Sequence, residues 1–278
     1  MAAAPAHLRL LEDIARDLSG DVNFPTCLDA AVGIRNALRD PFASLDRVAR
    51  AIGGEPLIAS KLLRLANSTA YNPGGRASGD LATAIRRLGF EVVRATALAV
   101  ALEQMLASRR NARNERIGRD AWEHSIEVAA IARVLARRIG RINPEEALLA
   151  GLVHDIGVFY LLFRTADLPE YADEALLMDL LRGWHEEIGI ALLQQLGLPD
   201  SLVAAIRGHD HPHDTAAPCA LGDVLYFANL LAGDDRDWTP DDLTPEERAA
   251  RTADRARQAG LLDEAADDIA SLRSALAG

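Results

Sequence analysis

The sequence is poor in aromatic residues, cysteine and lysine, and these scarcities exclude several classes of protein. Only 5% of its 278 residues are aromatic, while alanine and leucine are abundant, a mixture that favours helices over sheet sandwiches. Cys27 and Cys219 lie far apart and match no metal-ligand spacing, which argues against a zinc knuckle or a disulfide scaffold. Lys61 is the only lysine. We therefore expect an all-α protein.

Long uncharged stretches are also absent. The longest run without Asp, Glu, Lys or Arg is Ile188–Pro199, which has 12 residues, whereas a membrane-spanning helix needs roughly 18 or more apolar residues. A signal peptide is not expected, because Glu12 and Asp13 interrupt the N-terminal apolar stretch. The sequence therefore predicts a cytoplasmic protein that does not contact a membrane.

Basic residues are outnumbered, with 30 Lys+Arg against 41 Asp+Glu and a formal net charge of −11. General nucleic-acid binding needs a basic surplus on one face, so we do not expect it. More than half of the negative excess lies in residues 234–278, which contain 12 acidic and 6 basic residues. The net negative charge therefore comes mainly from this tail and indicates little about the rest of the chain.

The pattern of apolar and polar residues divides the chain into parts. We expect an N-terminal helix over residues 1–16, a helical lobe over 17–108, a second helical lobe over 121–233 and an acidic helical tail over 234–278. The stretch from Ser108 to Asp120 is polar and rich in Arg and Asn, which is the composition of a linker between the two lobes.

Local signals mark where several helices begin and end. Proline follows Phe24, Asp40 and Glu55, and each pair predicts a helix start with proline in the first turn. Asp80 can cap a helix that Gly89 interrupts.

Both ends of the chain are predicted to be helical. In the N-terminal helix, Leu8, Leu11, Ala15 and Leu18 form an apolar face that would pack on the body of the protein or on a second copy. In the tail, the run from Thr244 to Glu247 has the sequence of a capping box with proline at the first helical position.

Six of the seven histidines lie in the second lobe. His124, His185 and His209 each continue the apolar stripe of a predicted helix, so their rings point to its buried side. The doublet His154-Asp155 ends another predicted helix. A single inward histidine is usually a hydrogen-bonded core residue, but four of them with an adjacent carboxylate favour a metal site.

Imidazole and carboxylate ligands suit Mn, Fe, Zn or Ni, and the residue types do not select among these metals. Such an ion could polarise a phosphoryl oxygen and lower the pKa of bound water. His211 and His213 lie in a proline-containing loop, and we expect both to be exposed.

Motifs in both lobes resemble a known family. GLVHDIG from Gly151 to Gly157, with WEHS from Trp122 to Ser125 upstream, resembles the HD metal-dependent phosphohydrolase superfamily. In the first lobe, LLRLANS from Leu62 to Ser68, with Tyr71 after it, is similar to the HDOD domain, an HD-related output domain of bacterial signalling proteins. The resemblance covers most of the chain, about residues 17–233. It implies a small helical bundle packed on an HD-type helical bundle.

The resemblance also implies a set of metal-site residues. They are His124, His154, Asp155, His185, His209, Asp210 and Asn229. The first histidine and the His-Asp doublet match the whole superfamily, and His185 matches a further histidine of the related HD-GYP phosphodiesterases. Those enzymes have a His-His pair where this chain has His209-Asp210, and a carboxylate at the second position can still coordinate a metal.

Several departures from the family pattern bear on catalysis. Asn229 replaces the closing aspartate of the superfamily, and its neutral carbonyl is a poorer ligand for a divalent cation. Asp223 is an alternative ligand, although it lies about 120° around the same helix. Val158 replaces the lysine that follows the doublet in HD-GYP enzymes, and the Gly-Tyr-Pro motif is missing. The resemblance therefore implies no hydrolysis of cyclic di-GMP by the known route.

Three functions are consistent with these observations. The favoured one is a bacterial signal-transduction output module that regulates signalling proteins through protein interaction and has a partly retained metal site. The alternative is a metal-dependent phosphohydrolase that acts on a nucleotide or cyclic nucleotide. The third is a sensor that binds a nucleotide-type ligand between the lobes without hydrolysing it.

Overall fold

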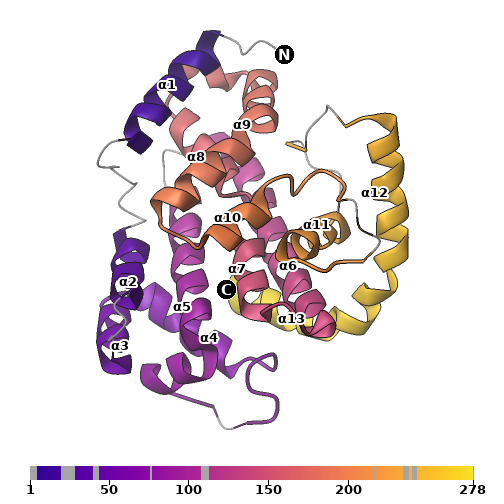
Figure 1. Cartoon of the computed structure of the whole chain (residues 1–278). Coiled ribbons are helices and arrows are strands. Elements are labelled where there is room, and N and C mark those ends of the chain that lie inside the picture. The colour runs from indigo at the N-terminus through magenta and orange to yellow at the C-terminus, as the bar shows by residue number, and fades with distance from the viewer. Residues whose placement is uncertain are drawn as a thin grey trace.

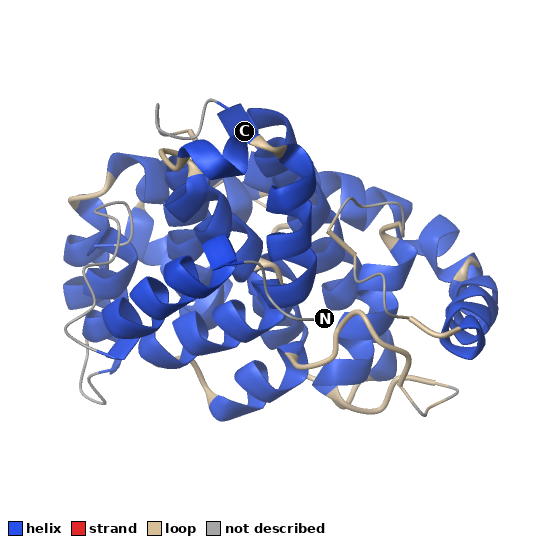
Figure 2. Cartoon of the chain, turned by 90° about the horizontal axis from the view of Figure 1, so that it is seen from above, coloured by secondary structure: helices blue, strands red, loops and turns tan. Residues whose placement is uncertain are grey.

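The described part of the chain is built from helices alone. The computed structural model describes residues 5–19, 29–39, 44–75, 77–107, 113–213, 215, 217–233, 238–239 and 243–277. Every regular element within these residues is a helix, and no strand occurs among them (Figure 2). The all-α class is therefore confirmed.

The first five helices along the chain include one long helix. They are α1 (Pro5–Ser19), α2 (Asp29–Arg39), α3 (Leu45–Gly53), α4 (Pro56–Asn67) and α5 (Leu81–Leu106). Helices α2, α3 and α4 all pack on α5 (Figure 1). Helix α5 also contacts the helices that follow it, so one apolar core runs through both parts of the molecule.

The next six helices pack around α6. They are α6 (Glu115–Ile139), α7 (Pro144–Val153), α8 (Ile156–Thr165), α9 (Glu174–Gln195), α10 (Asp200–Ile206) and α11 (Leu221–Leu231). Helices α7 and α11 lie against α6, while α8 packs on α9 and α10 on α11. The histidines predicted to form a site all come from this group.

The tail is helical, as expected, and both of its helices pack on the body. Helix α12 (Pro245–Gln258) lies on α11 at the right-hand edge in Figure 1, and α13 (Gly260–Ala277) lies against α6 and α4. Thr244 caps α12 through the predicted capping box with Glu247. The tail thus touches both groups of helices.

The predicted helix signals agree with the structure where it describes them. Helix α4 begins at Pro56, and the Asp80 carboxylate caps α5 by accepting a 2.8 Å hydrogen bond from the Thr83 amide. Gly89 interrupts α5 with a φ of 79°, a conformation that glycine adopts without strain. The pairs Phe24-Pro25 and Asp40-Pro41 lie outside the described residues.

The predicted apolar face of the N-terminal helix is correct at Leu11 and Leu18 but wrong at Leu8 and Ala15. Leu8 is 52% exposed, whereas Leu10, Ile14 and Leu18 are buried. His7 continues this buried stripe and sits between the Tyr171 hydroxyl and the Asp179 carboxylate. These polar contacts turn the helix so that it docks on α9, which the apolar pattern alone could not show.

Helix α6 begins earlier than the composition suggested. The polar stretch from Ser108 to Asp120 has the composition of a linker, yet its residues from Glu115 onward are helical. Arg119 pairs with Glu115 at i,i+4 over 2.5 Å, and Ile117 is buried. Such pairs stabilise a helix whose sequence is mostly polar. The division into two lobes at this point stays a prediction.

A buried polar cluster joins the two groups of helices. The Arg133 guanidinium of α6 binds the Glu145 carboxylate of α7 through Nε at 3.0 Å and Nη2 at 2.9 Å. The Tyr71 hydroxyl, from the segment after α4, donates to the same carboxylate, and Arg133 stacks over the Tyr71 ring. We call these three residues the junction cluster.

The stretch Pro144–Thr165 is long and apolar enough to cross a membrane by length and composition alone. However, 89% of its most apolar window is buried inside the protein. This is the pattern of core helices covered by protein on all sides.

Candidate metal centre

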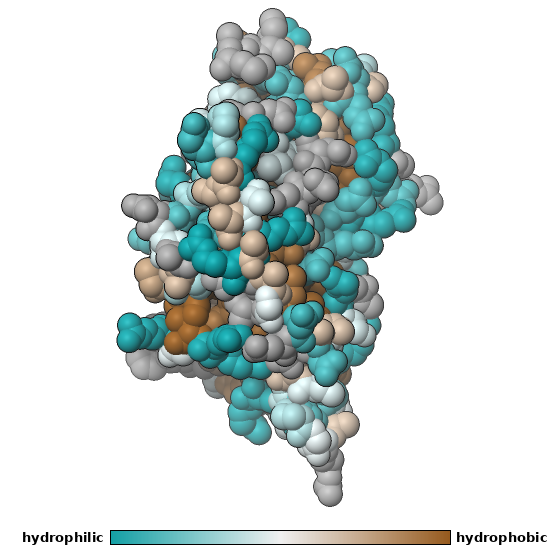
Figure 3. Space-filling model, turned by 90° about the vertical axis from the view of Figure 1, so that its right-hand side faces the viewer, coloured by the Kyte–Doolittle hydropathy of each residue, from teal (hydrophilic) through white to brown (hydrophobic). Residues whose placement is uncertain are grey.

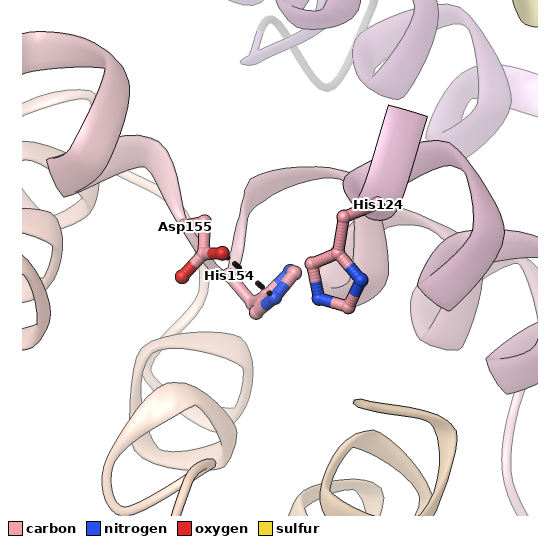
Figure 4. A group of neighbouring side chains, drawn as sticks. All are labelled: His124, His154 and Asp155. Atoms are coloured by element: carbon pink, nitrogen blue, oxygen red, sulfur yellow. Dashed lines mark ion pairs between the residues drawn. The ribbon is translucent and has the colours of Figure 1, made fainter. Parts of the chain in front are cut away.

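The His-Asp doublet lies where α7 ends and α8 begins. His154 follows the last residue of α7, and Asp155 takes the N-cap position of α8 without making a side-chain capping bond. An aspartate at this position usually accepts a bond from the helix amides. Here the carboxylate is instead turned toward His154, with the His124 ring beyond it (Figure 4).

Two glycines allow the helices around the doublet to approach closely. A Cβ atom at Gly151 of α7 would lie 2.4 Å from the Ala129 Cα of α6, and one at Gly157 of α8 would lie 1.8 Å from the His185 carbonyl oxygen of α9. No larger residue fits at either point without backbone movement. These contacts set the distance from the doublet to His124 on one side and to His185 on the other.

His209 and Asp210 follow α10 in a tight turn. Gly208 begins the turn with a φ of 69°, and its amide donates to the Glu186 carboxylate at 2.9 Å. Glu186 belongs to α9, next to His185. The turn is therefore fixed to α9, and this places His209 beside His185, with ring centroids 5.5 Å apart.

Three of the histidines share one hydrogen-bond pattern. The Nδ1 atoms of His154, His185 and His209 each lie 2.8 Å from a backbone carbonyl oxygen. A carbonyl can only accept, so Nδ1 carries a proton in each ring. In the neutral ring Nε2 is then left with its lone pair, the form in which histidine binds metals.

The atoms that face the centre of this cluster lack hydrogen bonds. The Nε2 atoms of the same three histidines and Oδ1 of Asp155 are buried and have no hydrogen-bond partner. The ring nitrogens lie 3.3–3.9 Å from the nearest carboxylate oxygens, without hydrogen-bond geometry. Four such atoms together are unusual, because buried polar groups are normally satisfied.

These atoms are close enough to share an ion. Ligand atoms of His124, His154 and Asp155 lie within 4.8 Å of one another, and so do those of Asp155, His185 and His209. Asp155 is common to both groups. A divalent ion with ligands at about 2.0–2.2 Å would fit either group after small side-chain adjustments.

The electrostatics of the cluster also favour a cation. The ion pairs of Asp155 and Asp210 within the described residues are all with histidines. Burial opposes the charged carboxylates, but the neighbouring histidines outweigh it and hold the pKa of each aspartate well below its usual value. Burial likewise opposes a charge on His209, yet Asp210 and Asp155 raise the pKa of His209 to about 9. Protons on the histidines thus balance the negative charge of the two carboxylates. A bound metal ion could replace these protons.

Asn229 links three members of the cluster rather than offering a free oxygen. Its Oδ1 atom lies 2.9 Å from the His124 Nε2 atom. Its Nδ2 atom donates to the Asp210 carboxylate at 2.9 Å and to the His209 carbonyl at 3.3 Å. Since the carboxylate accepts from Nδ2, Oδ1 faces His124 and accepts a hydrogen bond from the Nε2–H group of that ring.

All seven predicted site residues therefore meet in one place, with exposed fractions between 0% and 6%. Asp223 does not join them. It caps its own helix by accepting from the Cys219 and Ala220 amides, and it pairs with His213 at 2.8 Å. The alternative that Asp223 replaces the missing aspartate is thus wrong.

The two remaining histidines of the second predicted lobe lie outside the cluster. His211 is partly buried, with its side chain 40% exposed, and lies 3.7 Å from Glu247. His213 is half-buried and stacks on the Tyr226 ring with centroids 5.1 Å apart. Its expected exposure is therefore wrong, because the loop folds back on α11.

Sequence reasoning missed the residues that close the site. Trp238, in the segment between α11 and α12, donates from Nε1 to the Asp155 Oδ2 atom at 3.0 Å. Arg251 of α12 donates to the Asp210 backbone carbonyl. A tryptophan within a strongly acidic stretch was the one available signal, since such a ring needs a buried place in the fold.

The residues present fit a divalent metal. The donor set combines neutral imidazole and carboxylate, which suits Mn, Fe, Zn or Ni, and buried ring nitrogens lack any other partner. The outer contacts are those of a metal site as well, with backbone carbonyls holding the histidines and an indole holding the carboxylate.

Comparison with known proteins agrees with this architecture. A proposed metal-dependent phosphohydrolase from Shewanella amazonensis has a similar fold, with a TM-score of 0.75, 23% sequence identity and coverage of 97% of this chain and 99% of that one. An uncharacterized protein of Treponema pallidum is 24% identical over 71% of this chain and 40% of its own length. Ribonuclease Y of Thermus thermophilus is 33% identical over 42% of this chain and 16% of its own length. The chain thus spans less than half the length of these two relatives.

A known domain family also matches most of the chain. Residues 24–212 match the HDOD domain family, and this range includes both the Leu62–Ser68 motif and the His-Asp doublet. The resemblance inferred from those motifs is confirmed: the chain belongs to the HDOD domain family.

Proposed function

We propose that this protein is a signal-transduction output module that acts through protein interaction and holds one divalent metal ion in a closed centre. The observation that carries the proposal is that the donor atoms are present but covered. Four inward-facing atoms lack partners, while the seven residues around them are at most 6% exposed. An ion held there would organise the second lobe rather than meet a substrate.

The donors we assign to the ion are His154, Asp155, His185 and His209. Each has a buried atom without a hydrogen-bond partner, Asp155 belongs both to the group with His154 and to the group with His185 and His209, and the Asp210 carboxylate lies 3.3 Å from the His185 ring. His124 is assigned a supporting role, because its Nε2 atom is already bonded to Asn229. A bound ion would supply positive charge that neutralises the two buried carboxylates.

Two sequence features support a regulatory rather than a catalytic role. Asn229 gives the centre one negative charge fewer than an aspartate would, and Val158 offers no cationic group for a phosphate. Val158 is also fully buried. We propose signalling proteins in the cytoplasm as the partners, with a second copy of the chain as another candidate.

A second function is a metal-dependent phosphohydrolase that acts on a nucleotide, a cyclic nucleotide or another phosphodiester. The retained histidines and the partial similarity to ribonuclease Y favour it. In this function a bound metal would activate water and polarise the phosphoryl oxygen. The covered centre would then have to open to admit the substrate.

Metal analysis combined with a turnover assay separates the two functions. The full chain is stripped and reloaded with Mn²⁺, Fe²⁺, Zn²⁺ or Ni²⁺, then assayed on nucleotides, cyclic nucleotides and short RNA. We expect one ion per chain and no turnover above that of His154→Ala. Turnover that His154→Ala abolishes would establish the enzyme, and absence of metal after reloading would refute the metal centre.

A further inference from the structure

The tail reaches the metal centre at two points. Trp238 binds the side chain of Asp155, and Arg251 of α12 binds the backbone of Asp210. These aspartates are the two carboxylate residues of the centre. Both tail residues lie outside the part of the chain that matches the HDOD domain family, which ends at residue 212. The tail thus lies beyond the matched domain and contacts the centre directly.

The hydrogen bond from Trp238 occupies one oxygen of the Asp155 carboxylate and leaves the other without a hydrogen-bond partner. The indole is 97% buried, and its Nε1 atom donates to Oδ2 at 3.0 Å. Oδ1 has no hydrogen-bond partner and lies 3.5 Å from the His209 ring and 3.9 Å from the His185 ring, while Oδ2 also lies 3.3 Å from the His154 ring. One hydrogen bond therefore fixes the rotation of the carboxylate and leaves the other oxygen directed at the donor nitrogens. Outer hydrogen bonds of this kind orient metal ligands in proteins.

Other contacts make the tail one unit with this indole. The Tyr226 hydroxyl of α11 donates to Asp254 of α12 at 3.0 Å, and both residues are buried. Farther along, Ser271 of α13 accepts a 2.8 Å bond from Thr69, and Arg273 pairs with Glu127 at 2.9 Å. The tail is thereby joined to the metal centre, to α6 and to the segment after α4.

The outer face of the tail is polar. Figure 3 shows the side of the molecule that carries α12, where hydrophilic residues predominate and hydrophobic ones form only small patches. Five of the first ten residues of α12 are charged. Of the charged residues of this helix, only Arg251 and Asp254 are buried. The few buried contacts, including those at the metal centre, therefore decide how firmly α12 is held.

We infer that Trp238 is a positioning residue for the metal and that metal binding in turn fastens the tail to the second lobe. This inference rests on the proposed function, because it needs an ion at the centre. If the docked indole strengthens metal binding by some factor, the ion strengthens docking of the tail by the same factor. The centre then regulates how firmly the tail joins the two groups of helices.

The experiment uses the full chain, metal-free and loaded with Zn²⁺ or Mn²⁺ alone. Limited trypsin digestion reports opening of α12, because Arg248 and Arg255 are exposed cleavage sites that need local unfolding. We expect the ion to slow cleavage in α12 at least about tenfold. Hydrogen exchange over Pro245–Gln258 gives the same comparison without protease. Equal cleavage and exchange with and without a bound ion would overturn the inference.

A pair of tryptophan variants tests the positioning role. Trp238→Phe keeps a buried ring but removes the donor, and calorimetry should show metal affinity lowered about 10–100-fold. Trp122→Phe is the matched control, because Trp122 is also buried and contacts Phe159 rather than a donor residue. Equal affinities of the two variants would contradict the role of Trp238. If the wild-type chain binds no ion, the proposed function fails; if it binds an ion without protecting α12, only this inference fails.

Discussion

Two buried polar clusters in this protein differ in whether they are complete. In the junction cluster, one carboxylate faces one guanidinium and one hydroxyl, and only Nη1 of Arg133 lacks a hydrogen-bond partner. In the proposed metal centre, two carboxylates form ion pairs with histidines and also accept hydrogen bonds from the neutral side chains of Trp238 and Asn229, while four inward-facing atoms lack partners. In the junction cluster, the charges of Arg133 and Glu145 balance each other without a bound ion. We propose that a cation completes the centre.

The largest effect is expected from removing a donor of the centre. His154→Ala deletes one of three imidazoles whose Nε2 atoms are free, and metal affinity should fall by more than the ~100-fold typical of an outer contact. Calorimetric titration and metal analysis measure this. His213→Ala is the control, because His213 pairs with Asp223 away from the centre. A chain that keeps full affinity without His154 would show that the ion lies elsewhere.

Breaking the junction cluster should change stability but not metal binding. Glu145→Ala leaves the buried Arg133 without its counter-ion, at a cost of about 3 kcal/mol in the free energy of unfolding. This is the low end for a buried pair because the Glu145 side chain is 24% exposed. Urea denaturation of the metal-free chain measures the loss. A drop in metal affinity as large as that of His154→Ala would mean that the two clusters are not independent.

Restoring an acid at the centre should make it more dependent on a cation. Asn229→Asp removes the Nδ2 donor to Asp210 and adds a third carboxylate, so the metal-free chain should lose about 1–3 kcal/mol of stability. The rise in Tm on metal loading should be larger than in the wild-type chain, since a cation now neutralises more charge. Asn114→Asp is the matched control, because Asn114 is buried at the start of α6 and donates to Leu162. An unchanged metal response would count against the assigned centre.

The smallest effect is expected from trimming the junction cluster. Tyr71→Phe removes one hydroxyl, and Glu145 keeps both bonds to Arg133, so the loss should be about 1 kcal/mol. Thermal denaturation measures it, with Glu145→Ala as the reference. A loss as great as that of Glu145→Ala would show that the hydroxyl, and not the guanidinium, satisfies the carboxylate.

Much of the fold and the site follows from local chemistry in the sequence. Pro56, Asp80 and Thr244 begin or cap helices as their residue types predict, because these signals act over one helical turn. The histidines were found for a similar reason. Both the inward position of a histidine on an amphipathic helix and the His-Asp doublet can be recognised from the sequence alone.

The failures concern contacts between distant segments. Which face of α1 is buried depends on the hydrogen bonds of His7 with Tyr171 and Asp179. The pattern of apolar residues cannot predict such bonds. Trp238 reaches Asp155 across 83 positions, through a tail that charge alone described as polar. Asp223 was a plausible ligand by residue type, but its capping contacts direct it away from the centre.

X-ray absorption spectroscopy of the reloaded chain tests the central claim most directly. A chain that holds one Zn²⁺ ion in the assigned donor set should show a first shell of nitrogen and oxygen only, with the scattering signature of three imidazoles. His154→Ala should lose that signature. A first shell without imidazole, or one that His154→Ala leaves unchanged, would contradict the account.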